Sequence, residues 1–463
     1  MVGAPAPSEQ ALRQGQIGTA MQTLPHRPNI IFVLADDLGY ADLGCYGARL
    51  DAAGPVSPHL DRLAGQGLKF HQGYANSPVC SPTRFALMTG RYQYRHPGGC
   101  EEPISVKSRG STRLGLPPGL DTLPGWLKVA GYRTALIGKW HLGYAPAFGP
   151  LKSGYEEFFG PMSGGIDYFS HCSNGGVHDL YSGEEEVHAD GYLTDLLTDR
   201  ALAYIDRMAG NAADSKPFFL SLHYTAPHFP WQSRDDHALP DGTAGGLFHL
   251  DGGSIPVYRR MIQHMDEGIG RIWDRLVSLG IQGNTLIVFT SDNGGERFSD
   301  NWPLVGGKMD LTEGGIRVPW IAHWPAVIDP GGTSQQHCMS MDWSATLLAL
   351  AGVPQRDEWD GVSLVPVLKD AGHRFPRPLY WRMNHRGQRA YRLGDWKYLR
   401  VDGHDYLFNL AHDERERANL SKRHPDRLRA MRQAWEDWEA EMPATPPDAT
   451  VTLGFSQRDM PQR

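Results

Sequence analysis

The feature that most constrains the fold of this chain is a set of short, continuous apolar runs separated by segments with helical periodicity. The first run, residues 29–35 (NIIFVLA), is rich in branched side chains and predicts a buried strand. Amphipathic helices are predicted at residues 193–208 and 258–279. The strand pattern recurs at 133–138, 217–223, 285–290 and 320–323. This alternation predicts an α/β fold: a large, mostly parallel sheet flanked by helices.

A change in composition after about residue 370 predicts a second, smaller unit. Residues 390–401 and 406–410 predict strands of a short antiparallel sheet. The helix predicted after them carries one apolar side, which we interpret as core packing and not as a cofactor site: Leu428, Met431, Trp435, Trp438 and Met442. We therefore expect three parts, namely a flexible N-terminal arm at 1–27, a catalytic domain at 28–372, and a C-terminal α+β subdomain with an extended tail at 373–463.

The charge balance limits the classes of partner. The 463 residues include 45 Lys and Arg against 52 Asp and Glu, a formal net charge of -7. This mild acidity argues against nucleic acid or an anionic membrane as a partner, although a local cationic pocket can still bind a small anion. No stretch is long and apolar enough to span a bilayer, and residues 1–28 contain no signal-peptide core. As written, the sequence predicts a cytoplasmic protein, or a periplasmic or secreted one if a leader was removed.

Acidic and amide side chains follow two of the predicted strands. Asp36 and Asp37 come directly after the first strand, and Asp292 and Asn293 follow the 285–290 strand. In open α/β sheets, ligands bind beyond the carboxyl ends of the strands, so these side chains are expected to meet. Three carboxylates and a carboxamide suit Ca²⁺ or Mg²⁺ better than Zn²⁺. The alternative is that such residues only cap the turns that follow the strands.

One of the five cysteines has an unusual context. The five are scattered, form no CxxC pair, and are expected to be reduced thiols. Cys80 lies in SPVCSPTR, just before the helical pattern FALMTG, so it is placed at a helix N-terminus, where backbone N–H groups favour an anion. Arg84 lies one turn further along. Two simpler interpretations are a buried structural cysteine and a plain thiolate nucleophile.

The segment from Cys80 to Arg91 (CSPTRFALMTGR) resembles the signature of the type I, formylglycine-dependent sulfatases, which belong to the alkaline-phosphatase-like superfamily. Other segments resemble motifs of that family in the same order. Ala345 departs from the family pattern, which usually has proline there. The resemblance extends from about residue 29 to 420 and includes NIIFVLADDLGY (29–40), GYRTALIGKWHLG (131–143), APHFP (226–230), TSDNGG (290–295), GK (307–308), EGGIRVP (313–319), DWSATLLALAG (342–352) and DGVSL (360–364).

The resemblance implies a cofactor and a modified residue. A formylglycine-generating enzyme would oxidise Cys80 to Cα-formylglycine, whose hydrate would be the nucleophile. Asp36, Asp37, Asp292 and Asn293, together with residue 80, would hold one Ca²⁺, with Mg²⁺ as the alternative. The implied activity is hydrolysis of sulfate monoesters, on an aryl group or a carbohydrate, to inorganic sulfate and an alcohol.

The resemblance also implies roles for the cationic and histidine residues. Arg84 and Lys139 would fix the hydrated aldehyde, and His141 would be the base that expels sulfate and restores the aldehyde. Lys308 and His228 would bind the sulfate, and one of them would protonate the leaving oxygen. We assign the role of the acid to His228, with Lys308 as the alternative. In the simpler interpretation, these side chains point outward or cap turns.

Three rival functions remain. The first is a phosphatase, phosphodiesterase or phosphonate monoester hydrolase of the same superfamily, and the phosphonate monoester hydrolases tend to show histidine where this chain has Asn293. An inactive homologue that binds sulfated glycans would be expected to have lost Cys80, Lys139 or a metal ligand, and a plain cysteine hydrolase is the third. Four histidines match no motif and are interpreted as loop or core residues, or as part of the substrate mouth: His171, His178, His188 and His223. Specificity is expected from the C-terminal subdomain and from loops at 96–115, 160–190, 229–257 and 296–306.

Overall fold

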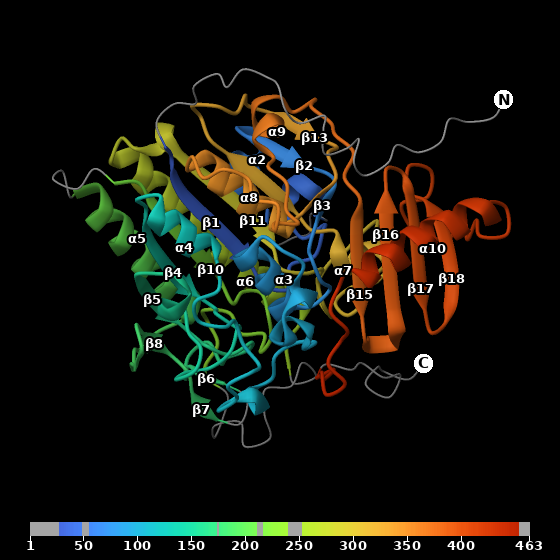
Figure 1. Ribbon diagram of the computed structural model, residues 1–463. Helices are drawn as coiled ribbons and strands as arrows, with labels where there is room; N and C mark the ends of the chain where they lie inside the picture. Colours follow the sequence, from blue (N-terminus) through green and yellow to red (C-terminus); the bar gives the residue numbers. More distant parts are fainter. Residues whose placement is uncertain (1–26, 49–54, 174–175, 211–215, 239–251, 453–463) are drawn as a thin grey trace.

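The structure, a computed structural model, describes residues 27–48, 55–173, 176–210, 216–238 and 252–452. Within these ranges the largest element is a ten-stranded mixed sheet (Figure 1). Its four central strands are β11 (Thr285–Ser291), β1 (Asn29–Ala35), β10 (Phe218–His223) and β4 (Arg133–Gly138). Two groups of outer strands flank them: β13 (Gly332–Ser334), β2 (Leu68–Phe70) and β12 (Trp320–His323) beside β11, and β5 (Glu157–Gly160), β8 (Tyr181–Ser182) and β9 (Glu185–Glu186) beside β4.

The centre of the sheet is parallel, and among the strands described here each antiparallel pair includes an outer strand. Strand β1 pairs in parallel with both β10 and β11, so Ile31 faces Leu220 on one side and Ile287 on the other. Strands β10, β4 and β5 continue the parallel arrangement. Strand β12 runs antiparallel to β11, and β8 runs antiparallel to β5. The predicted fold class, a large and mostly parallel sheet flanked by helices, is confirmed.

Both faces of the sheet are covered, which explains the unbroken apolar sequence of β1. Successive side chains of a strand point to opposite faces. Ile31 and Val33 belong to one core with helices α2 (Pro58–Gly65), α5 (Leu193–Gly210) and α6 (Ile255–Ser278). Ile30 and Phe32 belong to a second core with three other helices, α3 (Cys80–Thr89), α4 (Leu123–Val129) and α8 (Ser340–Leu350).

A smaller antiparallel sheet lies beside the large one (Figure 1). Its strands are β15 (Leu379–Met383), β16 (Gln388–Leu393), β17 (Trp396–Val401) and β18 (His404–Asn409). Helix α10 (Pro425–Ala440) packs on it through Met431, Trp435 and Trp438, which lie in a third core with the apolar face of the sheet. The aromatic stripe of α10 is therefore core packing, as the sequence indicates. The predicted boundary at residue 372 falls between α9 (Val365–Lys369) and β15, whereas the predicted arm lies, except for Arg27, outside the described residues.

A buried ionic cluster joins the small sheet to helix α7 and to Tyr74 of the short strand β3 (Gly73–Tyr74). Glu313, in the short helix α7 (Glu313–Ile316), accepts hydrogen bonds from Lys397 Nζ at 3.0 Å and Arg392 Nη1 at 3.3 Å, both on the small sheet. The hydroxyl of Tyr74 donates to the same carboxylate at 2.6 Å. Because a buried charge is costly unless it is paired, this cluster fixes the small sheet against the segment that leads out of the active site.

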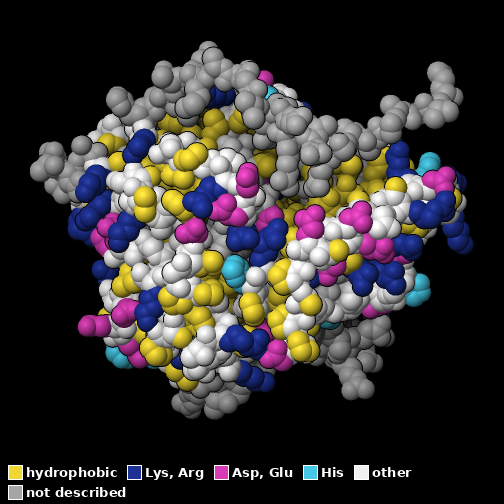
Figure 2. Space-filling view, in the orientation of Figure 1, with side chains coloured by type: hydrophobic (Ala, Val, Ile, Leu, Met, Phe, Trp, Pro, Cys, Tyr) yellow, Lys and Arg dark blue, Asp and Glu magenta, His cyan; other side chains and the backbone are white. Residues whose placement is uncertain are grey.

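The charges on the surface are mixed, and the helices have the character expected from the composition of the chain. The face in Figure 2 carries lysine and arginine side chains interspersed with aspartate and glutamate. None of the helices in the described ranges combines the length and the apolar character needed to cross a membrane.

Candidate active site

The side chains that follow β1 and β11 meet at one edge of the sheet. Because Ala35 pairs with Ser291, the two strands end side by side. The backbone N–H of Asp37 donates to Asp292 Oδ1 at 3.2 Å, and Asn293 Nδ2 donates to Asp37 Oδ1 at 2.7 Å. Asp36, Asp37, Asp292 and Asn293 are all buried. Asp37 has a φ of 61°, a left-handed conformation that is uncommon outside glycine and that turns its side chain into the site.

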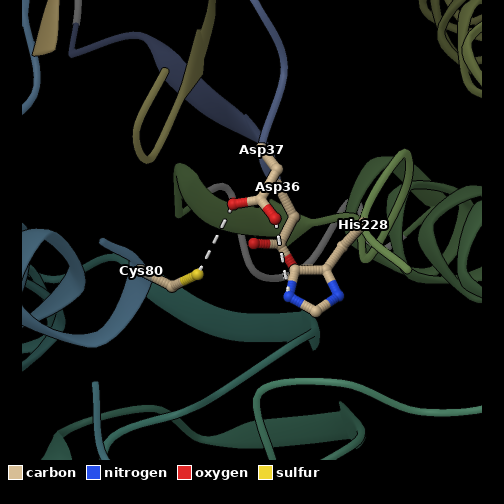
Figure 3. A group of neighbouring side chains, drawn as sticks. All are labelled: Asp36, Asp37, Cys80 and His228. Carbon is tan, nitrogen blue, oxygen red and sulfur yellow. Dashed lines mark hydrogen bonds and ion pairs between the residues drawn. The ribbon is translucent and has the colours of Figure 1, made fainter. Parts of the chain in front are cut away.

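Helix α3 brings Cys80 to the same place. Cys80 is the first residue of the helix, after the extended N-cap residue Val79, and its side chain is 1% exposed. Its side chain points toward Asp37 (Figure 3), and Sγ lies 3.7 Å from Asp37 Oδ1. Burial raises the pKa of the thiol well above its ordinary value, despite the opposing attraction of Lys139 and Lys308. The unmodified side chain is thus a neutral thiol, which argues against the plain thiolate nucleophile.

Arg84 and Lys139 neutralise two of the carboxylates. The guanidinium of Arg84 holds Asp292 Oδ2 through Nε at 3.0 Å and Nη2 at 2.9 Å, while Nη1 donates to the carbonyl of Lys139 at 3.0 Å. Lys139, directly after β4, places Nζ 2.6 Å from Asp36 Oδ2. Burial opposes ionisation of Asp292, but the attraction of Arg84 and Lys139 outweighs it and lowers the pKa of this carboxyl.

Two oxygens of this cluster have no hydrogen-bond donor. Asp36 Oδ1 and Asn293 Oδ1 are buried and lack a hydrogen-bond partner. Burial is the largest cause that raises the pKa of Asp36 to about 8, although Lys139 counteracts it. Buried oxygens that lack a donor, beside a carboxyl group whose pKa is raised, are typical of a site that binds a hard cation. The donor set, all oxygen, fits Ca²⁺ or Mg²⁺.

His141 is oriented as a neutral base. It follows β4 by three residues, has a φ of 58°, and is packed against Gly164, where a Cβ would lie 2.4 Å from the imidazole Cε1. Its Nε2 lies 2.8 Å from the carbonyl of Ile104, which can only accept, so Nε2 carries the proton. Nδ1 is buried without a hydrogen-bond partner. Burial, followed by the charge of Lys139, lowers the pKa of His141 well below its ordinary value.

His228 and Lys308 form a pair on the other side of Asp37. Lys308 Nζ lies 2.7 Å from Asp37 Oδ2 and 3.4 Å from His228 Nε2. His228 Nε2 lies 3.5 Å from the same carboxylate (Figure 3). Its Nδ1 faces the carbonyl of Phe229 at 2.6 Å and therefore carries the ring proton. Burial and the charge of Lys308 lower the pKa of His228. For Lys308, the attraction of Asp37 and Cys80 outweighs the effect of burial and raises the pKa of the ammonium group. The proton of this pair accordingly resides on Lys308.

The structure therefore brings together nine of the ten residues that the sequence singles out, through direct contacts or a shared partner. His141 is joined to them less directly, because it lies two residues beyond Lys139 and its side chain makes its hydrogen bond with the carbonyl of Ile104. The ligand atoms of Asp36, Asp37, Cys80 and His228 all lie within 4.8 Å of one another. Of the expected specificity loops, residues 174–175 and 239–251 lie outside the described part of the chain.

Three further residues of the site were not identified from the sequence. His223, at the end of β10, places Nδ1 3.4 Å from Arg84 Nη1, and burial followed by Arg84 lowers its pKa to about 3. Glu296 is half-buried near Lys308, its buried Oε1 has no hydrogen-bond partner, and desolvation raises its pKa to about 7. Its position directly after the DNGG segment was the signal that could have identified it.

The third missed residue, Gln388, lies on the small sheet and holds the backbone beside Lys308. Its Nε2 donates to the carbonyl of Met309 at 2.8 Å, and its Oε1 accepts from the N–H of Leu311 at 2.8 Å. Met309, with a φ of 78°, donates its own N–H to the carbonyl of Pro78, two residues before Cys80. One buried side chain thus connects the small sheet to both the lysine and the cysteine segments.

Comparison with known proteins gives matches over most of the chain. Residues 28–353 match the family model described as Sulfatase, and residues 307–431 match one described as N-sulphoglucosamine sulphohydrolase, C-terminal. An N-acetylgalactosamine-6-sulfatase of Rattus norvegicus is 33% identical over 411 residues, which cover 82% of this chain and 73% of the relative. An N-acetylgalactosamine-6-O-sulfatase of Bacteroides thetaiotaomicron is 28% identical, covering 89% of this chain and 93% of the relative.

A solved structure extends the similarity to three dimensions. The crystal structure of Ps i-CgsB in complex with k-i-k-neocarrahexaose superposes with a TM-score of 0.80 and 31% sequence identity. The superposition covers 92% of this chain and 95% of the other. The similarity therefore includes both the large sheet and the smaller antiparallel one.

Proposed function

Because this chain belongs to the sulfatase family and hydrolyses sulfate esters, we propose that it does so with a formylglycine made from Cys80, assisted by one Ca²⁺, on a carbohydrate sulfate. The observation that carries this proposal is the position of Cys80. Its Sγ lies at a helix N-terminus, 3.7 Å from Asp37, among three carboxylates that are each paired with a cation. The hydrated aldehyde supplies an oxygen nucleophile and a second hydroxyl, which a serine or a thiol could not.

The cation would be held by the oxygens at the strand ends. Asp36, Asp37, Asp292 and Asn293 provide the hard donor set, and two of their oxygens lack a donor in the protein. When bound, Ca²⁺ would neutralise charge on the sulfate and lower the pKa of the attacking hydroxyl. Arg84 holds Asp292 and Lys139 holds Asp36 in position through contacts of 2.6–3.0 Å, and together their charges favour the ionised form of Asp292.

Proton transfer would be divided between two residues, His141 and Lys308. His141 Nδ1, unprotonated and without a partner, would accept the proton from the remaining hydroxyl as sulfate departs. Lys308, which holds the proton of the Lys308–His228 pair, would supply the proton to the leaving oxygen, with His228 Nε2 positioned to share it at 3.4 Å. This assignment favours Lys308 over His228 as the acid.

The substrate class rests on relatives. Several matched relatives are named N-acetylgalactosamine-6-sulfatase, and the structural neighbour was solved with a neocarrahexaose. We propose a sulfated carbohydrate as the substrate class and a simple aryl sulfate as the second candidate. Maturation would require a formylglycine-generating enzyme, and because Cys80 is 1% exposed, that enzyme would have to act before the fold closes around it.

The modification can be tested by the mass of the peptide that contains Cys80. We expect a species lighter than the thiol form that reacts with hydroxylamine reagents. Cys80→Ala is expected to abolish turnover of both a sulfated galactosamine and 4-nitrophenyl sulfate. Cys338→Ala is the matched control, because Cys338 is an equally buried thiol outside the site. Full activity in a preparation that contains only the unmodified thiol would refute the proposed nucleophile.

A further inference from the structure

A second group of metal-binding side chains lies outside the active site. His178, in β7 (Val177–His178), meets Glu186 of β9 and His188, two residues further along. The ligand atoms of the three lie within 4.8 Å of one another. His178 Nδ1 is 3.0 Å from Glu186 Oε1, and the rings of His178 and His188 are 4.1 Å apart. Figure 2 shows histidine and acidic side chains together at the lower left of the molecule, in the region of β8.

We propose that His178, Glu186 and His188 bind one divalent transition-metal ion, with Zn²⁺ as the best match. Two imidazoles and one carboxylate are a ligand set that Zn²⁺ favours, whereas Ca²⁺ takes oxygen ligands only. The all-oxygen group at the ends of β1 and β11 has the opposite preference. The two sites therefore select different ions, and the second is independent of the reaction at Cys80.

The spacing of the three ligands suits a tetrahedral ion with water in the fourth position. With Zn–N distances of about 2.1 Å, two ligand atoms of a tetrahedral site lie about 3.4 Å apart. The His178–Glu186 separation of 3.0 Å is already near that value. Glu186 and His188 are exposed, so their side chains can rotate to close the remaining distance without disturbing a packed core. His178 is half-buried and fixes the position of the site.

The location gives the proposed ion a structural role. His178 is followed by Asp179, whose carboxylate accepts the backbone N–H of Ser163 at 2.8 Å. Gly164, the next residue, packs against the ring of His141. An ion that joins β7 to the β8–β9 hairpin would therefore stiffen the segment that forms one wall of the active site. We expect it to raise the stability of the protein and not to enter the chemical step.

The test is a titration of the full chain with Zn²⁺ by calorimetry. Transition metals are first removed with a chelating resin, and millimolar Ca²⁺ is kept present so that the all-oxygen site is occupied. The matched pair of variants is Glu186→Gln and Glu185→Gln, which remove the same charge from adjacent residues of β9. A third variant, His188→Ala, removes an imidazole. Absorption of bound Co²⁺ reports imidazole coordination in the unmodified protein.

The proposal predicts one Zn²⁺ per chain and a higher thermal unfolding temperature in the presence of Zn²⁺. Glu185→Gln should keep the affinity of the unmodified protein, whereas Glu186→Gln and His188→Ala should each bind at least about tenfold more weakly. Two results would overturn it: no Zn²⁺ uptake by the unmodified chain, or equal affinities for Glu186→Gln and Glu185→Gln. If a variant fails to fold, the Co²⁺ spectrum of the unmodified chain decides, because a spectrum without imidazole ligands also overturns the proposal.

Discussion

Replacing Gln388 with alanine tests whether the small sheet positions the catalytic lysine. The substitution removes both hydrogen bonds that hold the backbone on either side of residue 310, at 2.8 Å each. The carbonyl of Met309 and the N–H of Leu311 would then be buried without their partner. Lys308 follows the same backbone, and its Nζ must stay within hydrogen-bonding distance of Asp37 and His228. We expect Lys308 to lose its fixed position while the fold persists.

The size of the effect follows from these contacts. Each unsatisfied buried group costs about 1–3 kcal/mol, so the variant should lose about 2–6 kcal/mol of unfolding free energy. A typical domain is stable by about 5–15 kcal/mol, so a loss in the lower part of the expected range leaves the protein folded at moderate temperature. A displacement of Lys308 Nζ by about 1 Å should lower kcat on the order of 10²-fold.

The assay distinguishes a displaced Lys308 from a general loss of folding or maturation. Thermal unfolding and the formylglycine content of the peptide containing Cys80 are measured first, so that kcat is referred to folded, matured enzyme. The pH profile of kcat is then recorded, because a displaced Lys308 loses the charge of Asp37 and its alkaline limb should move to lower pH. Gln433→Ala is the matched control: Gln433 is a glutamine on α10 whose amide bonds only to Asp437 at the surface. We expect that control to keep the kcat and pH profile of the unmodified protein.

The reasoning would be refuted by a particular combination of results. If Gln388→Ala loses the expected stability but keeps kcat within about threefold and an unshifted pH profile, Gln388 is structural only. Gln388→Glu provides a graded test, because its carboxylate can still accept from Leu311 but can no longer donate to Met309. Its kcat should lie between those of the alanine variant and the unmodified protein.

Three further predictions concern the site itself. Lys308→Ala should lower kcat about 10²–10⁴-fold for an alkyl sulfate but much less for 4-nitrophenyl sulfate, whose leaving group needs no acid; equal losses, measured by steady-state kinetics, would exclude Lys308 as the acid. The pKa of His141 is lowered below 6.5, so its neutral form persists on the acidic side and the acid limb of kcat should lie well below pH 6.5; a limb above that value would contradict its role. Arg84→Ala leaves Asp292 unpaired and should cost about 3–5 kcal/mol in denaturant unfolding; a loss under about 1 kcal/mol would contradict this pairing.

The parts of the molecule that the sequence predicts are those with a local signal. The central strands β1 and β4 were predicted at their observed bounds, because strands buried on both faces are continuous apolar runs. The metal-ligand candidates could be found because each lies directly at a strand end, and the carboxyl ends of parallel strands share one edge. By contrast, the outer strands β8 (Tyr181–Ser182) and β9 (Glu185–Glu186) are two residues long, which is too short to show a periodic pattern.

Residues that act through long-range packing carry no such signal. Gln388 lies 79 residues from Met309, and Lys397 lies 84 residues from Glu313, so neither pair is visible in local sequence. The sequence indicates only a loop, core or substrate-mouth residue at His223, because this histidine matches no motif. Only the pairing of β10 with β4 brings it against Arg84. Contacts of this kind depend on the order of strands in the sheet, which the apolar pattern does not specify.

The charges of the site explain why the net charge of the chain does not reveal an anion-binding site. Arg84 pairs with Asp292 at 2.9 Å, Lys139 with Asp36 at 2.6 Å, and Lys308 with Asp37 at 2.7 Å. Once a bound cation keeps all three carboxylates ionised, they cancel the three cationic side chains, so the protein groups of the occupied site are neutral within a chain of net charge -7. A dication held there and a doubly charged sulfate product would cancel in the same way. The ester substrate carries only one negative charge and the alcohol product carries none, so neither balances the dication. The occupied site is therefore electrostatically complementary to the released sulfate. The same balance predicts that neutralising any one of the six residues will weaken binding of sulfate or of the cation more than any surface charge does.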